Sequence, residues 1–318
     1  MRTRQHQKPI ALETKGKFWW LKWVMGIVVC LIMAGLVVKE WRKSQVVGHS
    51  QYRFNLAMIE PDKGVVFLSL DPAEKSVLAL PFPTNLAINS RTSGEYVVSS
   101  LYKLGSYQDK KGGMFARQKV QGFMRVPVPG YVVIHDSKKT IKASFNRAMR
   151  QIIFRQTESS LSKFDALVLL ARSNEYKWRE VSEEELVRVA VLDRSDKGFV
   201  YHPDRLQEYV GTRLFDWGIG EAKITVAIVN ASGVNGLGSD LADFLSNLGM
   251  DVVMVRSVSE NESLTKTQWQ VDNLDEDGEL QFIFENLFSL DKPKVEKIPD
   301  EYRAQVLIKV GTDAKDLF

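Results

Sequence analysis

Hydrophobic and polar positions divide the chain into an apolar amino-terminal segment and a long remainder with alternating patterns. Residues 23–38 are sixteen consecutive positions without a charge, a proline or an amide side chain. Taken back to Phe18, with Lys22 reaching the interface, the segment predicts a helix of about 31 Å, which matches a hydrocarbon core of roughly 30 Å. We expect a transmembrane helix over residues 18–38, because a core helix in a chain of this size seldom lacks a polar face.

Charges and tryptophans around this segment predict its orientation. The first 22 residues carry six basic side chains against one acid, Glu13, and tryptophans stand at both ends of the segment. We therefore expect residues 1–17 to be a basic cytoplasmic tail, residues 39–51 to be a tether and the remainder to lie outside the cytoplasm. A cleavable signal peptide is the alternative, but no Ala-x-Ala site follows the apolar run.

From Tyr52 the pattern predicts a β-meander. Short apolar runs at Phe54–Ile59, Val65–Leu70 and Ser76–Leu80 are separated by turn sequences that contain Pro61 and Pro72. Further apolar runs predict the remaining elements of a mixed α/β domain over residues 52–215. They are helices at Tyr96–Leu104, Phe115–Met124 and Thr140–Gln156, strands at Tyr131–Ile134 and Phe164–Ala171, and a helix that starts at the Ser182–Glu185 capping box.

The carboxy-terminal region, residues 221–318, has its own strand and helix order. Strands are predicted at Lys223–Val229, Met250–Val255, Thr267–Val271 and Val306–Val310. Helices are predicted from the leucine stripe that starts at Leu237 and from the stripe within Glu279–Phe288. The order β-α-β-β-α-β predicts a small sheet with both helices on one face, and the whole chain is of the α/β (α+β) class.

A glycine-bearing turn, Asn230–Gly238, joins the first strand and helix of this region. Backbone N–H groups at a helix start attract phosphate, which makes nucleotide binding a hypothesis. However, Gly233, Gly236 and Gly238 do not have the dinucleotide spacing, and no lysine follows them. We favour the structural interpretation, in which these glycines allow a tight turn and a close approach of helix to strand.

Composition and charge exclude several classes of function. With 44% hydrophobic and 26% charged residues the chain is ordinary for folded domains, and Cys30 is its only cysteine, so no intrachain disulfide forms. The net charge is only +4, and no basic face interleaved with aromatics predicts nucleic-acid binding. The four histidines have no partner at metal-ligand spacing, and neither a serine elbow nor a phosphate-binding loop is present, so no catalytic, cofactor or metal residues are predicted.

The stretches 65–86, 100–113 and 126–136 resemble the extracytoplasmic domain of the LytR-CpsA-Psr (LCP) family. The resemblance implies a membrane-anchored bacterial transferase that moves a glycopolymer from polyprenyl pyrophosphate to peptidoglycan with a divalent metal. The family has an Ile-Pro-Arg-Asp segment whose arginine meets the pyrophosphate, whereas Leu80–Asn85 has neither arginine nor aspartate. A pyrophosphate needs several converging donors or a metal, so we expect the domain to be inactive.

The turn in the carboxy-terminal region resembles the hallmark of the LytR C-terminal domain, Asn-Gly-Ser-Gly-Val-x-Gly-Leu-Ala. The matching positions, together with the aspartate of a closing Gly-x-Asp, are Asn230, Ser232, Gly233, Val234, Gly236, Leu237 and Asp313. That family has no catalytic residues to carry over and accompanies envelope domains.

Three functions compete on these grounds. The favoured one is a non-catalytic, single-pass envelope protein that presents its domains to wall polymers or partner proteins, with the bilayer bound through residues 18–38. The alternative is an active transferase, using Mg²⁺, whose phosphate ligands have moved to Arg91, Arg147, Arg150 and Arg155. Against this, a basic helix is usually a solvated face. A cytoplasmic transcriptional regulator is the third possibility, and it requires the opposite topology.

Overall fold

The computed structural model describes residues 19–48, 52–90, 94–108, 111–154, 157–196, 198–258, 263–272, 284 and 291–317. The chain separates into two compact units, residues 1–43 and 44–318. The first contains the helix α1 (Trp19–Lys43). Among the described residues, none of the helices meets the length and apolarity that a bilayer crossing requires. The span predicted over residues 18–38 is therefore not confirmed, and it lies partly outside the described residues, as does the predicted tail 1–17.

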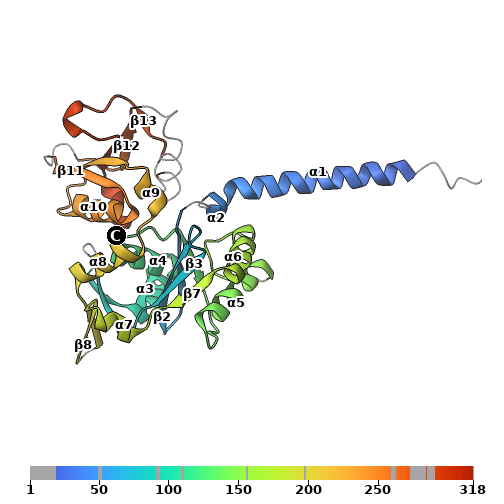
Figure 1. Cartoon of the computed structure of the whole chain (residues 1–318), viewed down its shortest axis with the longest axis horizontal. Coiled ribbons are helices and arrows are strands. Elements are labelled where there is room, and N and C mark those ends of the chain that lie inside the picture. The colour runs from blue at the N-terminus through green and yellow to red at the C-terminus, as the bar shows by residue number, and fades with distance from the viewer. Residues whose placement is uncertain are drawn as a thin grey trace, which may run out of the picture. The chain divides into compact units, whose positions relative to one another are not determined.

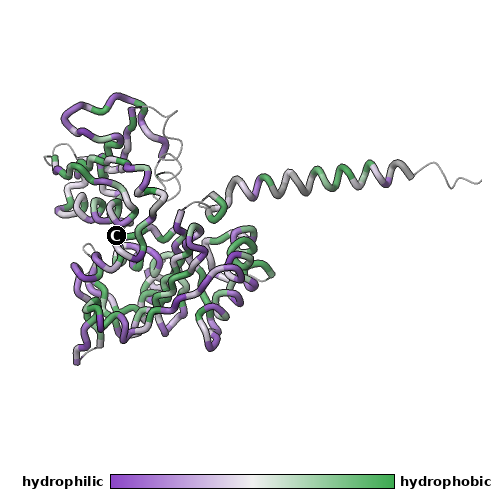
Figure 2. The backbone as a smooth tube through the Cα atoms, in the orientation of Figure 1, coloured by the Kyte–Doolittle hydropathy of each residue, from purple (hydrophilic) through white to green (hydrophobic). Residues whose placement is uncertain are grey.

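The second unit begins with the predicted meander. Strand β1 (Phe54–Glu60) pairs antiparallel with β2 (Gly64–Asp71), which pairs antiparallel with β3 (Ser76–Pro81). Strands β6 (Gly130–Val133) and β7 (Lys177–Glu180) add in parallel to β1 and β3, which gives the order β6-β1-β2-β3-β7. The strands at the centre are buried on both faces, and hydrophobic residues run along them (Figure 2).

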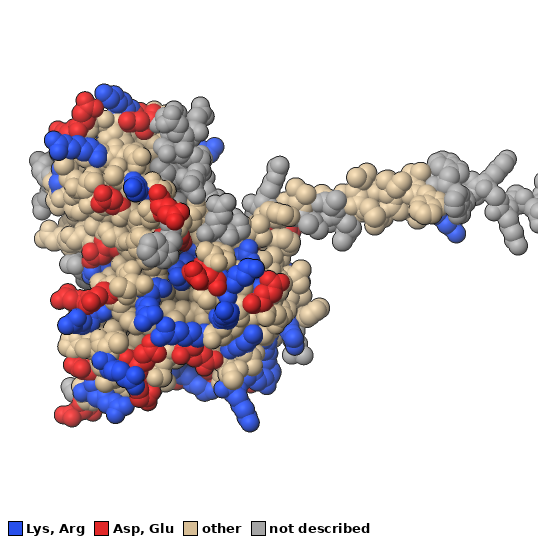
Figure 3. All heavy atoms as spheres, viewed as in Figure 1, with Lys and Arg blue, Asp and Glu red and all other residues tan. Residues whose placement is uncertain are grey.

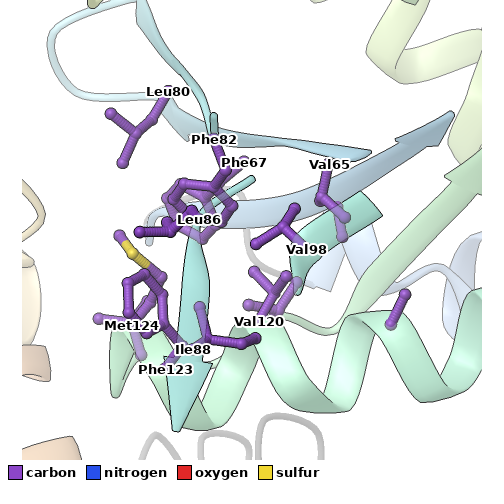
Figure 4. Packing of buried hydrophobic residues seen from close by; sticks show 14 of the residues in the cluster. Val65, Phe67, Leu80, Phe82, Leu86, Ile88, Val98, Val120, Phe123 and Met124 are labelled. Atoms are coloured by element: carbon purple, nitrogen blue, oxygen red, sulfur yellow. The ribbon is translucent and has the colours of Figure 1, made fainter. Parts of the chain in front are cut away.

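Helices cover both faces of this sheet (Figure 1). On one face, α4 (Gly112–Met124) packs over Phe67 and Leu80, and Phe82 meets Phe123 edge to face, with ring centroids 5.5 Å apart (Figure 4). On the other face, α5 (Ile141–Phe154) and α6 (Lys163–Glu175) bury their apolar stripes against β1 and β2. These two layers make the first domain a mixed α/β fold, as its sequence predicted.

Smaller elements complete this domain. They are the helix α2 (Gln45–Gly48), the hairpin β4 (Ala87–Ser90) and β5 (Gly94–Val97), the turn η1 (Val98–Ser100), α3 (Leu101–Tyr107), α7 (Glu183–Arg188), the hairpin β8 (Leu192–Ser195) and β9 (Gly198–Tyr201), and α8 (Pro203–Arg213). Helix α9 (Trp217–Glu221) leads to the carboxy-terminal domain, and the carboxylate of Asp216 accepts the backbone N–H groups of Arg53, Gly218 and Ile219.

The carboxy-terminal domain has a sheet in the order β11-β10-β14-β12-β13. Its strands are β10 (Thr225–Asn230), β11 (Asp251–Ser257), β12 (Gln268–Val271), β13 (Lys294–Val295) and β14 (Val306–Val310). The short helix η3 (Asp300–Tyr302) lies between β13 and β14, and η4 (Thr312–Leu317) follows β14. Strands β10 and β11 are parallel and are joined by α10 (Leu237–Leu248), so the predicted strand, helix and strand form a parallel β-α-β crossover. The second predicted helix, Glu279–Phe288, lies outside the described residues except for the buried Phe284.

Helix α10 also ties this sheet to the first domain. The guanidinium of Arg125, the left-handed residue that ends α4, forms ion pairs with Asp240 and Asp243, the one to Asp240 at 3.2 Å. The Arg125 carbonyl accepts the side-chain amide of Asn247 at 2.9 Å. These contacts belong to one compact unit and join residues that are more than a hundred positions apart.

Two predicted elements are wrong. Phe164–Ala171, predicted as a strand, lies inside α6, because Ser162 and Asp165 form a reciprocal capping box that starts a helix there. Within the predicted helix Tyr96–Leu104, the first residues pair in β5 and the helix α3 begins only at Leu101. In both cases a short apolar run fits either period, and the local cap or partner strand decides between them.

Candidate functional site

The candidate site lies where four strands of the first sheet end together. Strands β1, β3, β6 and β7 are mutually parallel, because β2 runs antiparallel to both β1 and β3. Their carboxyl ends therefore share one edge, where ligands commonly bind in open α/β sheets. At this edge the chain places Glu60, Pro81, Ile134 and Glu180, and the start of α5 closes it.

A pocket of about 200 Å³ opens at this edge. Its apolar wall consists of side chains from the strand ends and from α5, namely Met58, Val65, Val66, Pro81, Phe82, Ile134 and Ile141. Figure 4 shows two of them, Val65 and Phe82, on the face that packs against α4. The charged part of the lining consists of three lysines, Lys63, Lys138 and Lys139, and two glutamates, Glu60 and Glu180, and the lining also includes Gly64, Ser137 and Ser144.

Hydrogen bonds within the pocket hold its rim. The ammonium group of Lys63 pairs with the Glu60 carboxylate and donates to the Ser137 hydroxyl at 3.2 Å. The hydroxyl of Ser144 accepts the backbone N–H of Lys138 at 2.7 Å. At the start of α5, the carboxylate of Glu180 accepts the backbone N–H of Ile141 at 3.2 Å, which stabilises the helix terminus.

The lysines in the pocket lining outnumber the glutamates by one, so the lining has a net positive charge. Lys63 and Glu180 are engaged at the rim, and no described carboxylate forms an ion pair with Lys138 or Lys139, both of which are exposed. Two flexible ammonium groups beside an apolar wall suit a small anion carried on an apolar group. They do not offer the bidentate geometry of arginine, and the described residues contain no group of His, Cys, Asp and Glu side chains able to hold a metal ion.

Of the four predicted phosphate-binding arginines, the two that the structure describes, Arg147 and Arg150, do not line this pocket. Arg147 and Arg150 lie one turn apart on α5 and line a separate shallow hollow with Gln151 and Phe154. The Arg147 guanidinium donates to Asp136 at 2.7 Å. Arg91 and Arg155 lie outside the described residues. The lysines were missed because no motif marks them, although each follows the end of a strand, and that position was a usable signal.

Another polar cluster in this domain is structural. The Glu158 carboxylate accepts the Tyr102 hydroxyl at 3.0 Å and the Gly113 backbone N–H at 2.9 Å, which caps the start of α4. Burial, and then the neighbouring Glu158, raise the pKa of the Tyr102 hydroxyl, and burial also raises the pKa of Tyr131. Burial lowers the pKa of Arg117, which donates to the Val128 carbonyl at 2.9 Å. A raised pKa favours the protonated form of both hydroxyl groups.

The motif turn of the carboxy-terminal domain, residues 230–238, uses its polar groups internally. The Asn230 side chain donates to the Val234 carbonyl at 2.8 Å and accepts the backbone N–H of Ser232 at 3.1 Å. The Ser232 hydroxyl in turn accepts the Val234 N–H at 3.1 Å. Gly233 and Gly236 have φ of +69° and +82°, values that favour glycine. The structural interpretation of this turn therefore agrees with its hydrogen bonds.

The other motif residues are also occupied. Leu237 is fully buried in the core beneath α10. The Asp313 carboxylate accepts the Thr267 backbone N–H at 2.8 Å and the Thr267 hydroxyl at 2.6 Å. A Cβ on Gly238 would lie 3.1 Å from the Asn230 Cβ, which confirms the predicted close approach of helix to strand. The motif thus fixes the crossover between β10 and α10 and closes the sheet at β14.

Comparison with known proteins gives one family match and several solved structures that are similar to this chain. Residues 223–313 match the family described as LytR cell envelope-related transcriptional attenuator, which confirms the resemblance of the carboxy-terminal domain. Among solved structures, the crystal structure of B. subtilis TagT is 11% identical, with a TM-score of 0.35, and the match covers 50% of this chain and 89% of that chain. The crystal structure of B. subtilis TagV is 10% identical, with a TM-score of 0.34, over 50% and 94% of the two chains.

A third structure is the LytR-CPS2A-psr family protein YwtF (TagT) with bound octaprenyl pyrophosphate lipid, which is 10% identical with a TM-score of 0.33 over 50% of this chain and 88% of that chain. No curated protein matches the sequence. The carboxy-terminal domain thus matches the LytR C-terminal family, and one of the similar solved structures carries the LytR-CPS2A-psr family name.

Proposed function

We propose that the protein is a non-catalytic component of the bacterial cell envelope that binds a phosphate-bearing lipid or wall polymer through the pocket at the carboxyl edge of its first sheet. The observation that supports this is the pocket lining. The lining places Lys138 and Lys139 beside an apolar wall. The pocket volume is only about 200 Å³, which suits a phosphate headgroup better than a long polymer or lipid chain.

The absence of catalysis is part of the proposal. Transfer from a polyprenyl pyrophosphate develops negative charge that arginines or a metal must neutralise in the transition state. The pocket supplies lysines beside Glu60 and Glu180, and Phe82 is packed into the core within the stretch where the family resemblance implies an arginine. Ground-state binding without transition-state stabilisation gives affinity but no turnover.

Membrane anchorage is also proposed, and it rests on the sequence. The sixteen uncharged residues 23–38 and the basic residues before them support a single-pass protein with its amino terminus in the cytoplasm and its bulk outside. The carboxy-terminal domain is then presented to envelope proteins or wall glycopolymer. Fractionation of cells tests this part, because full-length protein found only in the soluble cytosol contradicts it.

The function is tested with the full chain in detergent, a polyprenyl-pyrophosphate-linked glycan and Mg²⁺. We expect saturable binding and no loss of lipid pyrophosphate. The variant Lys138→Gln/Lys139→Gln should bind about tenfold more weakly or worse, whereas Lys294→Gln, a charge change in the other domain, should bind normally. Metal-dependent loss of pyrophosphate would contradict the non-catalytic proposal and establish the transferase alternative.

A further inference from the structure

Helices α5 and α6 form an outer layer with an unusual surface. Both bury apolar stripes in the same core, with Phe145 and Met149 from α5 and Leu169 from α6. Because both helices lie on one face of the sheet, their opposite stripes point away from it, toward the surroundings. Those outward stripes carry Arg147, Arg150, Gln151 and Phe154 on α5 and Lys163, Leu167, Ala171 and, at the end of the helix, Glu175 on α6.

Two large apolar side chains are exposed in this layer. Phe154 is 80% exposed and Leu167 is 55% exposed. Phe154 shares a hollow with two guanidinium groups, those of Arg147 and Arg150. Single exposed apolar residues are common. Here, however, the apolar stripe of α5 is buried in the core, and its outward face places an aromatic side chain beside two cations, which are the two contacts that a membrane interface offers.

The charge of the layer has the sign that attracts anionic headgroups. Lys138, Lys139 and Lys142 precede the two arginines along the chain, and Figure 3 shows Lys and Arg side chains gathered over this part of the surface. No described carboxylate pairs with Arg150, which is exposed. Arg147 pairs with Asp136, but both partners are solvated, so this ion pair holds the guanidinium weakly.

The connection to the apolar segment reaches the same layer. Ser44, the residue that directly follows α1, donates its hydroxyl to Asp165 of α6 at 2.5 Å. The backbone N–H of Val46 donates to the same carboxylate at 3.2 Å, and the Val46 side chain is fully buried against the core beneath α5 and α6. The chain therefore enters its second unit on α6, within one residue of the helix that we propose as the anchor.

We infer that the outward face of α5 and α6, defined by Arg147, Arg150, Phe154, Lys163 and Leu167, docks on the anionic surface of the bilayer in which the protein is anchored. The inference rests on the proposed anchorage in one respect, the attachment at Ser44. The arginines and Lys163 bind phosphate headgroups, and Phe154 and Leu167 enter the boundary of the acyl chains. A wall polymer would satisfy the cations but provides no apolar phase for the two exposed side chains.

The test uses the full chain in a Cys30→Ser background, with Gln151→Cys carrying an environment-sensitive nitrobenzoxadiazole label. The protein is reconstituted in vesicles of phosphatidylcholine alone or mixed with phosphatidylglycerol. In the anionic vesicles we expect a blue shift, an intensity increase of about two- to fivefold and quenching by shallow spin-labelled lipid. The same label on Glu208→Cys, on α8, should not respond.

Variants separate the contributions of charge and apolar contact. Arg147→Gln and Arg150→Gln should each weaken the response about fivefold in lipid titrations. Phe154→Ser should abolish the blue shift, whereas Phe154→Leu should retain it. Lys294→Gln removes a charge from the carboxy-terminal domain and is the matched control. Because the side chains of Arg150 and Phe154 are exposed, circular dichroism should show these variants folded.

Three results would overturn the inference. They are a label at position 151 that does not respond to phosphatidylglycerol, a response that survives loss of both arginines, and a response produced in neutral vesicles by soluble teichoic acid, which would identify a polymer as the occupant. Flotation of the full chain with neutral vesicles tests the proposed membrane anchorage independently of the docking surface. If the chain does not float, the proposed anchorage fails, while a lipid response of the label in added anionic vesicles would still support the docking surface.

Discussion

The pocket of the first domain and the motif turn of the second occupy equivalent places in their sheets but use their polar groups in opposite ways. Both follow the carboxyl ends of parallel strands, β1 and β3 in one case and β10 in the other. In the motif turn, the side chains of Asn230 and Ser232 form hydrogen bonds with the backbone of the turn itself. In the pocket, Lys138 and Lys139 have no described carboxylate partner. The recognisable sequence motif therefore belongs to a turn that stabilises the fold. The pocket lysines, which are available to a ligand, are not part of any recognisable motif.

This difference predicts that changes in the two regions affect different properties. Substitutions in the motif turn should destabilise the fold, because each side chain completes a core or a hydrogen-bond set. Substitutions in the pocket should change ligand binding and leave stability nearly constant, because its lysines are solvated. The predictions below test this contrast by the free energy of unfolding, measured by chemical denaturation of the full chain in detergent.

The largest effect is expected for Leu237→Ala. Leu237 is fully buried beneath α10 in a core that includes Phe244 and Ile308, so truncation leaves a cavity and should lower the free energy of unfolding by about 2–5 kcal/mol. The control is Val253→Ala, on the edge strand β11, where the side chain is 41% exposed and the loss should stay below about 1 kcal/mol. Equal losses for the two variants would contradict a core role for the motif leucine.

A smaller loss is expected for Asn230→Ala. The substitution removes the bond to the Val234 carbonyl and leaves the Ser232 N–H without its acceptor, for a cost of about 1–3 kcal/mol. Asn235→Ala, at an exposed position of the same turn, is the matched control and should be nearly neutral. If Asn230→Ala instead left stability unchanged and reduced binding of a wall polymer, the turn would be a binding site rather than a structural device.

Much of this architecture was predictable, because local signals agreed with long-range ones. The meander β1-β2-β3 was predictable because prolines mark the turns between its apolar runs. The order β10-α10-β11 was predictable because a leucine stripe indicates the helix, which ends at Gly249, a left-handed cap with φ of +104°. The α6 helix was missed because its apolar run was short, and the capping box at Ser162 carried the deciding information.

The candidate site was less predictable than the fold. Of the predicted arginines, the two described ones on α5, Arg147 and Arg150, line an outward hollow and do not line the pocket at the carboxyl edge. Lys63 and Lys139 meet in one pocket only because β1, β2 and β6 are neighbours, which is a property of the sheet order. Ligand-facing residues of this kind become visible only once the pairing of strands is known.

Between the two regions, the junction residue Asp216 should give a pH-dependent effect. Burial raises its pKa above the usual 3.8, although the backbone N–H groups of Arg53, Ile219 and Gly218 oppose the shift. The folded state then binds the proton more tightly than the unfolded state, so this contribution to stability is full below pH 3.8 and is lost as pH rises through the raised pKa. Asp216→Asn keeps an acceptor and should gain stability relative to the wild type over that window. A parallel pH profile for the two proteins would contradict the assignment.

The smallest effect on stability, and the sharpest test of the contrast, is expected for Lys138→Gln/Lys139→Gln. Both side chains are exposed and form no ion pair with a described carboxylate, so the free energy of unfolding should change by no more than about 0.5 kcal/mol. Binding of inorganic pyrophosphate to the full chain, measured by calorimetry at low salt, should weaken severalfold, because the substitution removes two of the three lysines and leaves only Lys63, which is paired with Glu60. A loss of stability comparable to that of Leu237→Ala, with pyrophosphate binding unchanged, would contradict a ligand-binding role for the pocket and would give its lysines a structural role instead.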